Sequence, residues 1–70
     1  MNNFPKVSVL IPAYNVEAWV EESLRSILMQ SYPNFEIVII DDCSTDRTFE
    51  IITKLAFEDK RIISLKNSVN

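Results

Sequence analysis

The sequence predicts an α/β fold, namely a βαβαβ unit with a parallel three-stranded sheet. Three short apolar runs rich in β-branched residues alternate with two segments whose apolar residues recur at helical spacing. Connections of this length allow a helical crossover between parallel strands, and such crossovers are right-handed in about 98% of cases. The 70 residues are 47% hydrophobic and 24% charged, which is the balance of a folded domain and not of a disordered segment.

The first strand and the first helix are predicted in the N-terminal part of the chain. The run 7–11 is apolar and β-branched, and we expect Pro12 to end it because proline cannot donate to a sheet ladder. From Val16 the apolar residues follow a helical period, which predicts a helix from about 16 to about 30. Asn15 is expected to be its N-cap.

The second half of the chain repeats this alternation. Residues 35–40 predict a second strand, and its unbroken apolar run predicts burial on both faces, as in a parallel sheet. N-cap residue types at 44–46 precede a second helical period, which predicts a helix from Asp46 to about Glu58. A third strand is predicted at 62–65, with a loop after it.

Composition excludes several classes of protein. A formal net charge of −3 gives no reason to expect nucleic-acid binding, which depends mainly on Lys and Arg. Cys43 is the single cysteine and the chain has no His, so neither an internal disulfide nor a zinc cluster is expected. The absence of Gly argues against a dinucleotide-binding fingerprint. The lack of a leader and of an apolar span predicts a cytoplasmic protein, or one peripheral to the inner face of a membrane.

Two loops are the best candidates for a site, because ligands of open α/β sheets bind beyond the carboxyl ends of the strands. These loops are 12–15 and 41–44, and they lie side by side if their strands are neighbours. Tyr14 offers an aromatic face on which a base can stack. Asp42 can accept a hydrogen bond from a base N–H or a ribose hydroxyl, and its charge strengthens that bond. A nucleotide could therefore be bound without glycine.

The two loops also carry a family resemblance. The segment 7–15, which ends Ile-Pro-Ala-Tyr-Asn, is followed at a suitable distance by 37–46, which reads Ile-Val-Ile-Ile-Asp-Asp-Cys-Ser-Thr-Asp. Together these motifs resemble the opening of family 2 glycosyltransferases of the inverting GT-A type, and the resemblance covers nearly the whole chain. Residues 67–70 resemble the start of the Asn- and Gly-containing loop of that family. Cys43 stands where the family often has Gly or Asn.

The resemblance implies that residues 1–70 are the N-terminal nucleotide-binding portion of one truncated, Rossmann-like GT-A domain. It implies a UDP-sugar donor, a saccharide, lipid or protein acceptor, and a role in cell-surface polysaccharide synthesis. A divalent metal, Mg²⁺ or Mn²⁺, is implied for the parent enzyme, whose metal ligands and general base lie beyond residue 70. The fragment alone is therefore expected to be inactive and to contain no catalytic residue. The implied nucleotide-binding residues are Pro12, Ala13, Tyr14, Asn15, Asp41, Asp42 and Ser44.

Other interpretations of the same residues remain open at this point. Asp41 and Asp42 could simply end a strand, Ser44 could simply cap a helix, and Asn15 could be a cap and nothing more. A non-catalytic receiver-like or nucleotide-binding α/β module also places paired acidic residues at a strand end. A receiver needs a further Asp at the end of its third strand, where this chain has 65–67, Leu-Lys-Asn. The uncovered edge of a three-stranded sheet could also support self-association.

Overall fold

The computed structural model describes residues 3–68 and has the predicted order of elements. Three parallel strands form one sheet in the order β1-β2-β3. This confirms the predicted βαβαβ unit with a parallel three-stranded sheet. Val69 and Asn70, at the end of the predicted last loop, lie outside the described residues. The elements are β1 (Val7–Ala13), α1 (Val20–Leu28), β2 (Phe35–Asp41), α2 (Thr48–Glu58) and β3 (Ile62–Lys66).

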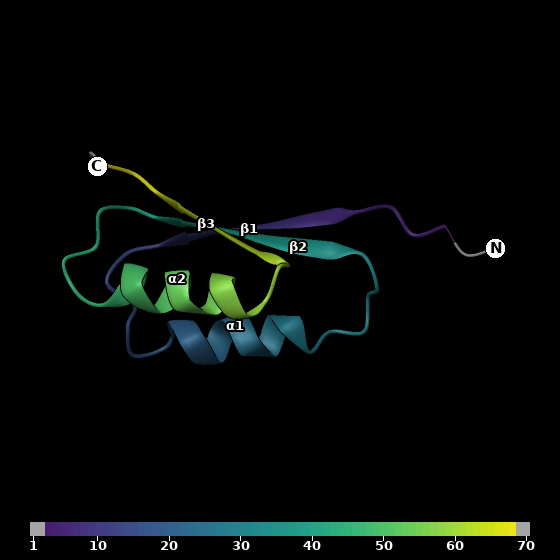
Figure 1. Cartoon of the computed structure of the whole chain (residues 1–70), viewed down its shortest axis with the longest axis horizontal. Coiled ribbons are helices and arrows are strands. Elements are labelled where there is room, and N and C mark those ends of the chain that lie inside the picture. The colour runs from purple at the N-terminus through teal and green to yellow at the C-terminus, as the bar shows by residue number, and fades with distance from the viewer. Residues whose placement is uncertain (1–2, 69–70) are drawn as a thin grey trace.

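Both helices lie on the same face of the sheet (Figure 1). The strands follow one another across the sheet in chain order, so both crossovers run in the same direction. Crossovers that share one hand then place their helices on one face. The loops that follow β1 and β2 lie together at the left-hand end of the view, at the carboxyl ends of the strands (Figure 1).

The hydrophobic core lies between the sheet and the two helices. Every second residue of β2 is buried from Phe35 to Asp41, and the residues between them are half-buried. The prediction that β2 is buried on both faces is therefore wrong for this chain, because both helices cover the same face. The buried apolar residues are Ala13, Val20, Leu24, Phe35, Ile37, Ile39, Ile52, Leu55 and Ile62.

Pro12 does not end the first strand. The strand continues through Ala13, and Pro12 pairs in register with Ile40. This is tolerated because β1 is an edge strand of the sheet, where a missing N–H leaves no ladder bond unmade. The second and third strands each run one residue beyond their predicted ends, to Asp41 and Lys66.

The first helix is shorter than predicted, and the second begins two residues later than predicted. α1 begins at Val20 and not at Val16, and it ends at Leu28. α2 begins at Thr48 and ends at Glu58, where its end was predicted. The residues missing from the start of each helix belong to the loops at the carboxyl edge, where the backbone N–H groups of Val16 and Glu17 donate to side chains of the second loop and of the start of α2.

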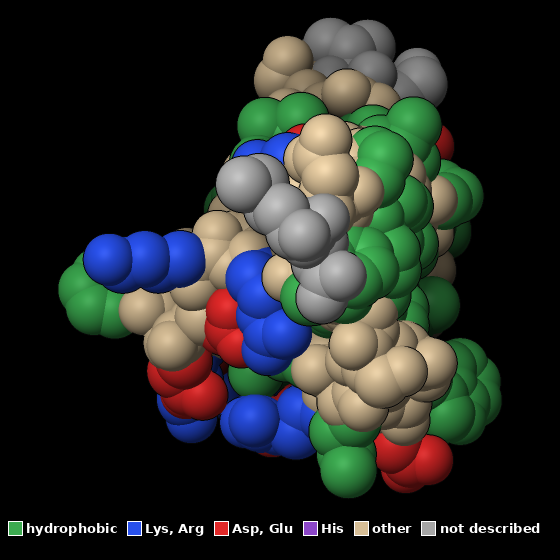
Figure 2. All heavy atoms as spheres, turned by 90° about the vertical axis from the view of Figure 1, so that its right-hand side faces the viewer, with side chains coloured by type: hydrophobic (Ala, Val, Ile, Leu, Met, Phe, Trp, Pro, Cys, Tyr) green, Lys and Arg blue, Asp and Glu red, His purple; other side chains and the backbone are tan. Residues whose placement is uncertain are grey.

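Hydrophobic side chains gather on one side of the molecule when it is seen from the amino ends of the strands, away from most of the visible Lys and Arg side chains (Figure 2). Along the edge strand β1, an apolar hollow of about 250 Å³ is lined by residues that include Val7, Val9 and Phe35. No helix among residues 3–68 has both the length and the apolar character to cross a membrane.

Candidate functional site

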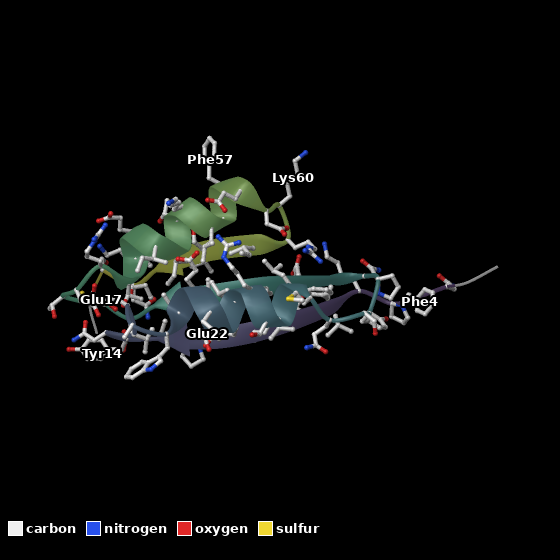
Figure 3. The ribbon with its side chains drawn as sticks, turned by 90° about the horizontal axis from the view of Figure 1, so that it is seen from below. Phe4, Tyr14, Glu17, Glu22, Phe57 and Lys60 are labelled. Atoms are coloured by element: carbon white, nitrogen blue, oxygen red, sulfur yellow. The ribbon has the colours of Figure 1, made fainter. Side chains whose placement is uncertain are left out.

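The two candidate loops begin side by side at the carboxyl edge of the sheet. Ala13 and Asp41, the last residues of β1 and β2, are paired in register. The backbone N–H of Asp42 donates to the carbonyl oxygen of Ala13 at 2.8 Å. Tyr14 is 51% exposed, and in Figure 3 it lies near Glu17 at the end of the molecule opposite Phe4. Asp42 is half-buried. The structure thus places Tyr14 and Asp42 at the same edge, with neither side chain fully buried.

Asn15 ties the first loop to the second. Its backbone N–H donates to Ser44 Oγ at 2.9 Å, and its Oδ1 accepts the backbone N–H of Thr45 at 2.8 Å. Asn15 has a φ of 50°, a left-handed conformation that Asn adopts more readily than most residues. The prediction that Asn15 is the N-cap of the first helix is wrong, because the helix begins at Val20 and the side chain is bonded to the other loop.

A second set of contacts joins the loops closer to the helices. Val16 donates its backbone N–H to the Oγ1 of Thr48 at 2.8 Å, and Thr48 is completely buried. Asp46 accepts the backbone N–H of Thr48 on Oδ1 at 2.9 Å and that of Glu17 on Oδ2 at 3.3 Å. Burial raises the pKa of Asp46, but the hydrogen bonds from Thr48 and Glu17 outweigh it and hold the pKa below its usual range.

Asp41 and Asp42 are neighbours in sequence but occupy different environments. Asp41 is completely buried, and its Oδ2 accepts the backbone N–H of Ser44 at 3.2 Å. Its Oδ1 has no hydrogen-bond partner among residues 3–68. A buried carboxylate oxygen without a donor costs free energy. In this arrangement Asp41 orients the turn that carries Asp42, and its carboxylate does not reach the surface.

Cys43 lies in the loop after β2, between Asp42 and Ser44, and adopts a left-handed conformation with a φ of 64°. Such a backbone costs roughly 1–2 kcal/mol for a residue with a Cβ. The Cys43 Sγ lies 3.5 Å from the carbonyl oxygen of Ser68, in the loop after β3. A Gly or Asn at this position would adopt the same conformation with less strain.

A third loop, which the resemblance had placed after the third strand, also lies at this edge, but no site residue was predicted in it. The backbone N–H of Asn67 donates to the carbonyl oxygen of Asp41 at 2.8 Å. The side-chain amide of Asn67 donates from Nδ2 to Asp42 Oδ1 at 3.3 Å. The one signal available in the sequence was an Asn placed directly after a third parallel strand, which ends at the same edge as the first two.

The remaining predicted residues, Pro12 and Ala13, are the last two residues of β1. The Ala13 side chain is 4% exposed and belongs to the core, whereas Pro12 is exposed. Both line an apolar hollow of about 150 Å³, together with residues that include Val16 and Trp19. Trp19, to which the sequence assigned no function, is 65% exposed.

The described part of the chain offers no metal site. Within residues 3–68, no three Asp, Glu, Cys or His side chains come together in a way that could hold an ion. The described residues therefore supply no ligand set for the divalent metal, whose ligands the resemblance places beyond residue 70, and no chemical step at a metal can be derived from them.

Comparison with known proteins defines the class of this chain. The family model described as glycosyl transferase family 2 matches residues 8–70, and the chain belongs to this family. An uncharacterized glycosyltransferase of Haemophilus influenzae is 44% identical over 70 residues, which is 100% of this chain. The chain spans only 22% of the length of that relative. Family membership leaves the receiver-like alternative without support.

The fold is that of GT-A glycosyltransferases. A mannosyltransferase from Pyrobaculum calidifontis, solved in complex with GDP-Man and Mn²⁺, matches with a TM-score of 0.86 and 29% identity, covering 97% of this chain and 21% of that chain. TarS of Staphylococcus aureus, solved in complex with UDP-GlcNAc, matches with a TM-score of 0.80 and 38% identity. That match covers 94% of this chain and 19% of the TarS chain. TarS is a poly(ribitol-phosphate) beta-N-acetylglucosaminyltransferase.

Proposed function

We propose that residues 1–70 form the N-terminal nucleotide-binding portion of a longer GT-A domain. In this proposal the parent enzyme transfers a sugar, with inversion, from a nucleotide diphosphate donor to an acceptor hydroxyl. The chain itself binds the nucleotide and has no catalytic turnover. The observation that carries the proposal is the position of Tyr14 and Asp42, which begin adjacent loops at the carboxyl edge of a parallel sheet.

Each of these two side chains has a distinct part in the proposed site. The ring of Tyr14 is exposed and stacks on the base, a contact worth about 1–3 kcal/mol in nucleic-acid systems. The carboxylate of Asp42 accepts a hydrogen bond from an N–H at the edge of the base. Asn15 and Ser44 hold the two loops at a fixed separation, and Asp41 supports the second loop from beneath. Pro12 and Ala13 shape the wall on the side of the first loop.

The proposed donor is a UDP-sugar. TarS, which shares the fold and 38% of the aligned residues, was solved with UDP-GlcNAc. The mannosyltransferase that also shares the fold was solved with a guanosine donor and Mn²⁺, so the fold by itself accommodates both kinds of base. In the parent enzyme, a divalent metal would be held by residues outside 1–70 and would stabilise the departing diphosphate.

We also propose an acceptor and a cellular location for the parent enzyme, based on the names of its relatives. TarS acts on poly(ribitol phosphate), as its name states. An enzyme of this kind, working on cell-surface polysaccharide, takes its donor from the cytoplasm and can dock at the inner face of a membrane. The outer edge of β1, which pairs with no strand among residues 3–68, would be covered by later parts of the domain or by self-association.

The proposal is tested by removing the carboxylate of Asp42 in the full-length protein. Asp42→Ala should weaken UDP binding by about tenfold or more, because a hydrogen bond to a charged group contributes about 1.5–3 kcal/mol and each 1.4 kcal/mol is tenfold. Isothermal titration calorimetry measures the affinity. Glu22→Ala, which removes an exposed carboxylate on α1 well away from Tyr14 (Figure 3), is the matched control and should bind UDP like the wild type. Unchanged affinity in Asp42→Ala would remove Asp42 from the site.

A further inference from the structure

We propose that Asn67 determines which base this site prefers, by holding one of the two carboxylate oxygens of Asp42. The inference rests on the proposed function, since it assumes that Asp42 contacts the base. Its basis is the contact between Asn67 Nδ2 and Asp42 Oδ1 at 3.3 Å, which joins the loop after β3 to the loop after β2. Asn67 is a positioning residue, because it acts on the ligand through Asp42.

The backbone fixes Asn67 in place independently of its side chain. Its N–H donates to the Asp41 carbonyl oxygen at 2.8 Å, directly after the parallel pairing of Asp41 with Lys66. The chemistry of the pair also fixes the orientation of the side-chain amide. A carboxylate accepts hydrogen bonds and repels the amide oxygen, so the nitrogen of Asn67 must face Asp42.

This contact leaves the two oxygens of Asp42 in different states. Oδ1 accepts from Asn67, whereas no donor within residues 3–68 contacts Oδ2. The carboxylate therefore offers one oxygen to a ligand without a competing protein donor. A ligand that donates to both oxygens must share Oδ1 with the Asn67 amide, and this competition weakens the hydrogen bonds to that oxygen.

Uracil and guanine place different demands on such a carboxylate. Uracil has a single N–H on its base-pairing edge, between two carbonyl oxygens, so one carboxylate oxygen satisfies it. Guanine has two adjacent donors, a ring N–H and an amino group, which together match both oxygens of a carboxylate. With Asn67 bonded to Oδ1, Asp42 can bind uracil through Oδ2 alone, whereas guanine must share Oδ1 with the Asn67 amide. The geometry thus favours a uridine nucleotide over a guanosine nucleotide.

The test compares the affinities of UDP and GDP for the full-length protein by calorimetry. The wild type should prefer UDP, and Asn67→Ala should reduce the ratio of the two affinities by about tenfold, the size expected for one hydrogen bond to a charged group. Asn67→Asp keeps the shape of the side chain but replaces the donor with a second negative charge, and it should weaken UDP binding more than Asn67→Ala does. Ser68→Ala, in the same exposed loop, is the control and should keep the wild-type ratio.

The outcomes distinguish the role of Asn67 from the proposed nucleotide-binding function on which it rests. A reduced ratio in Asn67→Ala, with Ser68→Ala unchanged, supports the role of Asn67. An unchanged ratio in both Asn67 variants overturns it, while the proposed function still stands if Asp42→Ala loses UDP binding. A wild type that prefers GDP overturns the inference and leaves a nucleotide-sugar site. A wild type that binds neither nucleotide overturns both.

Discussion

The helix-covered face of the sheet and the carboxyl edge of the sheet are held together by different interactions. On the covered face, apolar side chains such as Leu24, Ile37, Ile39 and Ile52 are at most 1% exposed and pack between the layers. At the edge, the loops are joined by hydrogen bonds between polar side chains and backbone groups, such as those between Asn15 and the second loop. The face therefore supplies stability, and the hydrogen bonds at the edge fix the geometry of the loops that we propose bind the nucleotide.

The edge is also where the backbone is strained. Asn15 and Cys43 are the residues other than glycine with positive φ in the described part of the chain, and each lies in one of the two facing loops. Strain of this kind persists only where surrounding contacts hold it, and it is common at ligand sites. A substitution in the face should thus change folding, while one at the edge should change affinity.

The largest expected effect is a loss of stability without a loss of UDP affinity, from a substitution on the covered face. Ile39→Ala should destabilise the protein by about 2–5 kcal/mol, because it removes buried methyl groups and leaves a cavity. The folded fraction should bind UDP with unchanged affinity, since Ile39 contacts no ligand in the proposed site. Urea unfolding measures the first quantity and calorimetry at low temperature the second.

Ile39→Val is the matched control for this substitution. It removes only one methylene, and its cost should be about 0.5–1.5 kcal/mol. If Ile39→Ala cost no more than Ile39→Val, or if it weakened UDP binding as much as Asp42→Ala does, the covered face and the edge would not be separable in the way described above.

A smaller effect is expected at the edge, from Asn15. Asn15→Gly keeps the left-handed backbone but loses the Oδ1 that accepts the N–H of Thr45. UDP affinity should fall by about three- to tenfold, the equivalent of one ordinary hydrogen bond. Asn15→Asp retains both the acceptor and a tolerance for positive φ, so it should bind UDP more tightly than Asn15→Gly. Equal affinities for the two variants would show that the Thr45 contact does not position the site.

The pattern of the sequence determined the elements and the position of the candidate site. The apolar periods specify which segments pair and which cover the sheet, and strand ends in a parallel sheet meet at one edge. The sequence alone therefore predicted that Tyr14 and Asp42 lie in neighbouring loops at the same edge of the sheet. Pro12 was misread because the sequence does not show that β1 is an edge strand of this sheet.

The details of the edge could not be predicted, because they depend on contacts between segments about 30 residues apart. The segment from Val16 has a helical pattern, and the N–H of Val20 does donate to the Val16 carbonyl oxygen at 2.9 Å, but the regular helix begins only at Val20. The N–H groups of Val16 and Glu17 instead donate to Thr48 and Asp46 of the other loop, and the local pattern does not reveal these partners. The contact between Asn67 and Asp42 was beyond prediction for the same reason.

The smallest effect concerns pH and the contacts of Asp46. Its pKa is below the usual range in the folded protein, because the hydrogen bonds from Thr48 and Glu17 outweigh the effect of burial. A carboxylate with a lowered pKa contributes stability above the ordinary Asp pKa of about 4, and this contribution is lost as the pH falls through the folded value. Asp46→Asn cannot be protonated in this range. The free energy of unfolding, measured in urea between about pH 6 and pH 3, should therefore fall less steeply in Asp46→Asn than in the wild type. Glu22→Gln serves as the control and should follow the wild-type slope. If Asp46→Asn followed that slope as well, the negative charge of Asp46 would contribute nothing to the stability of the folded protein.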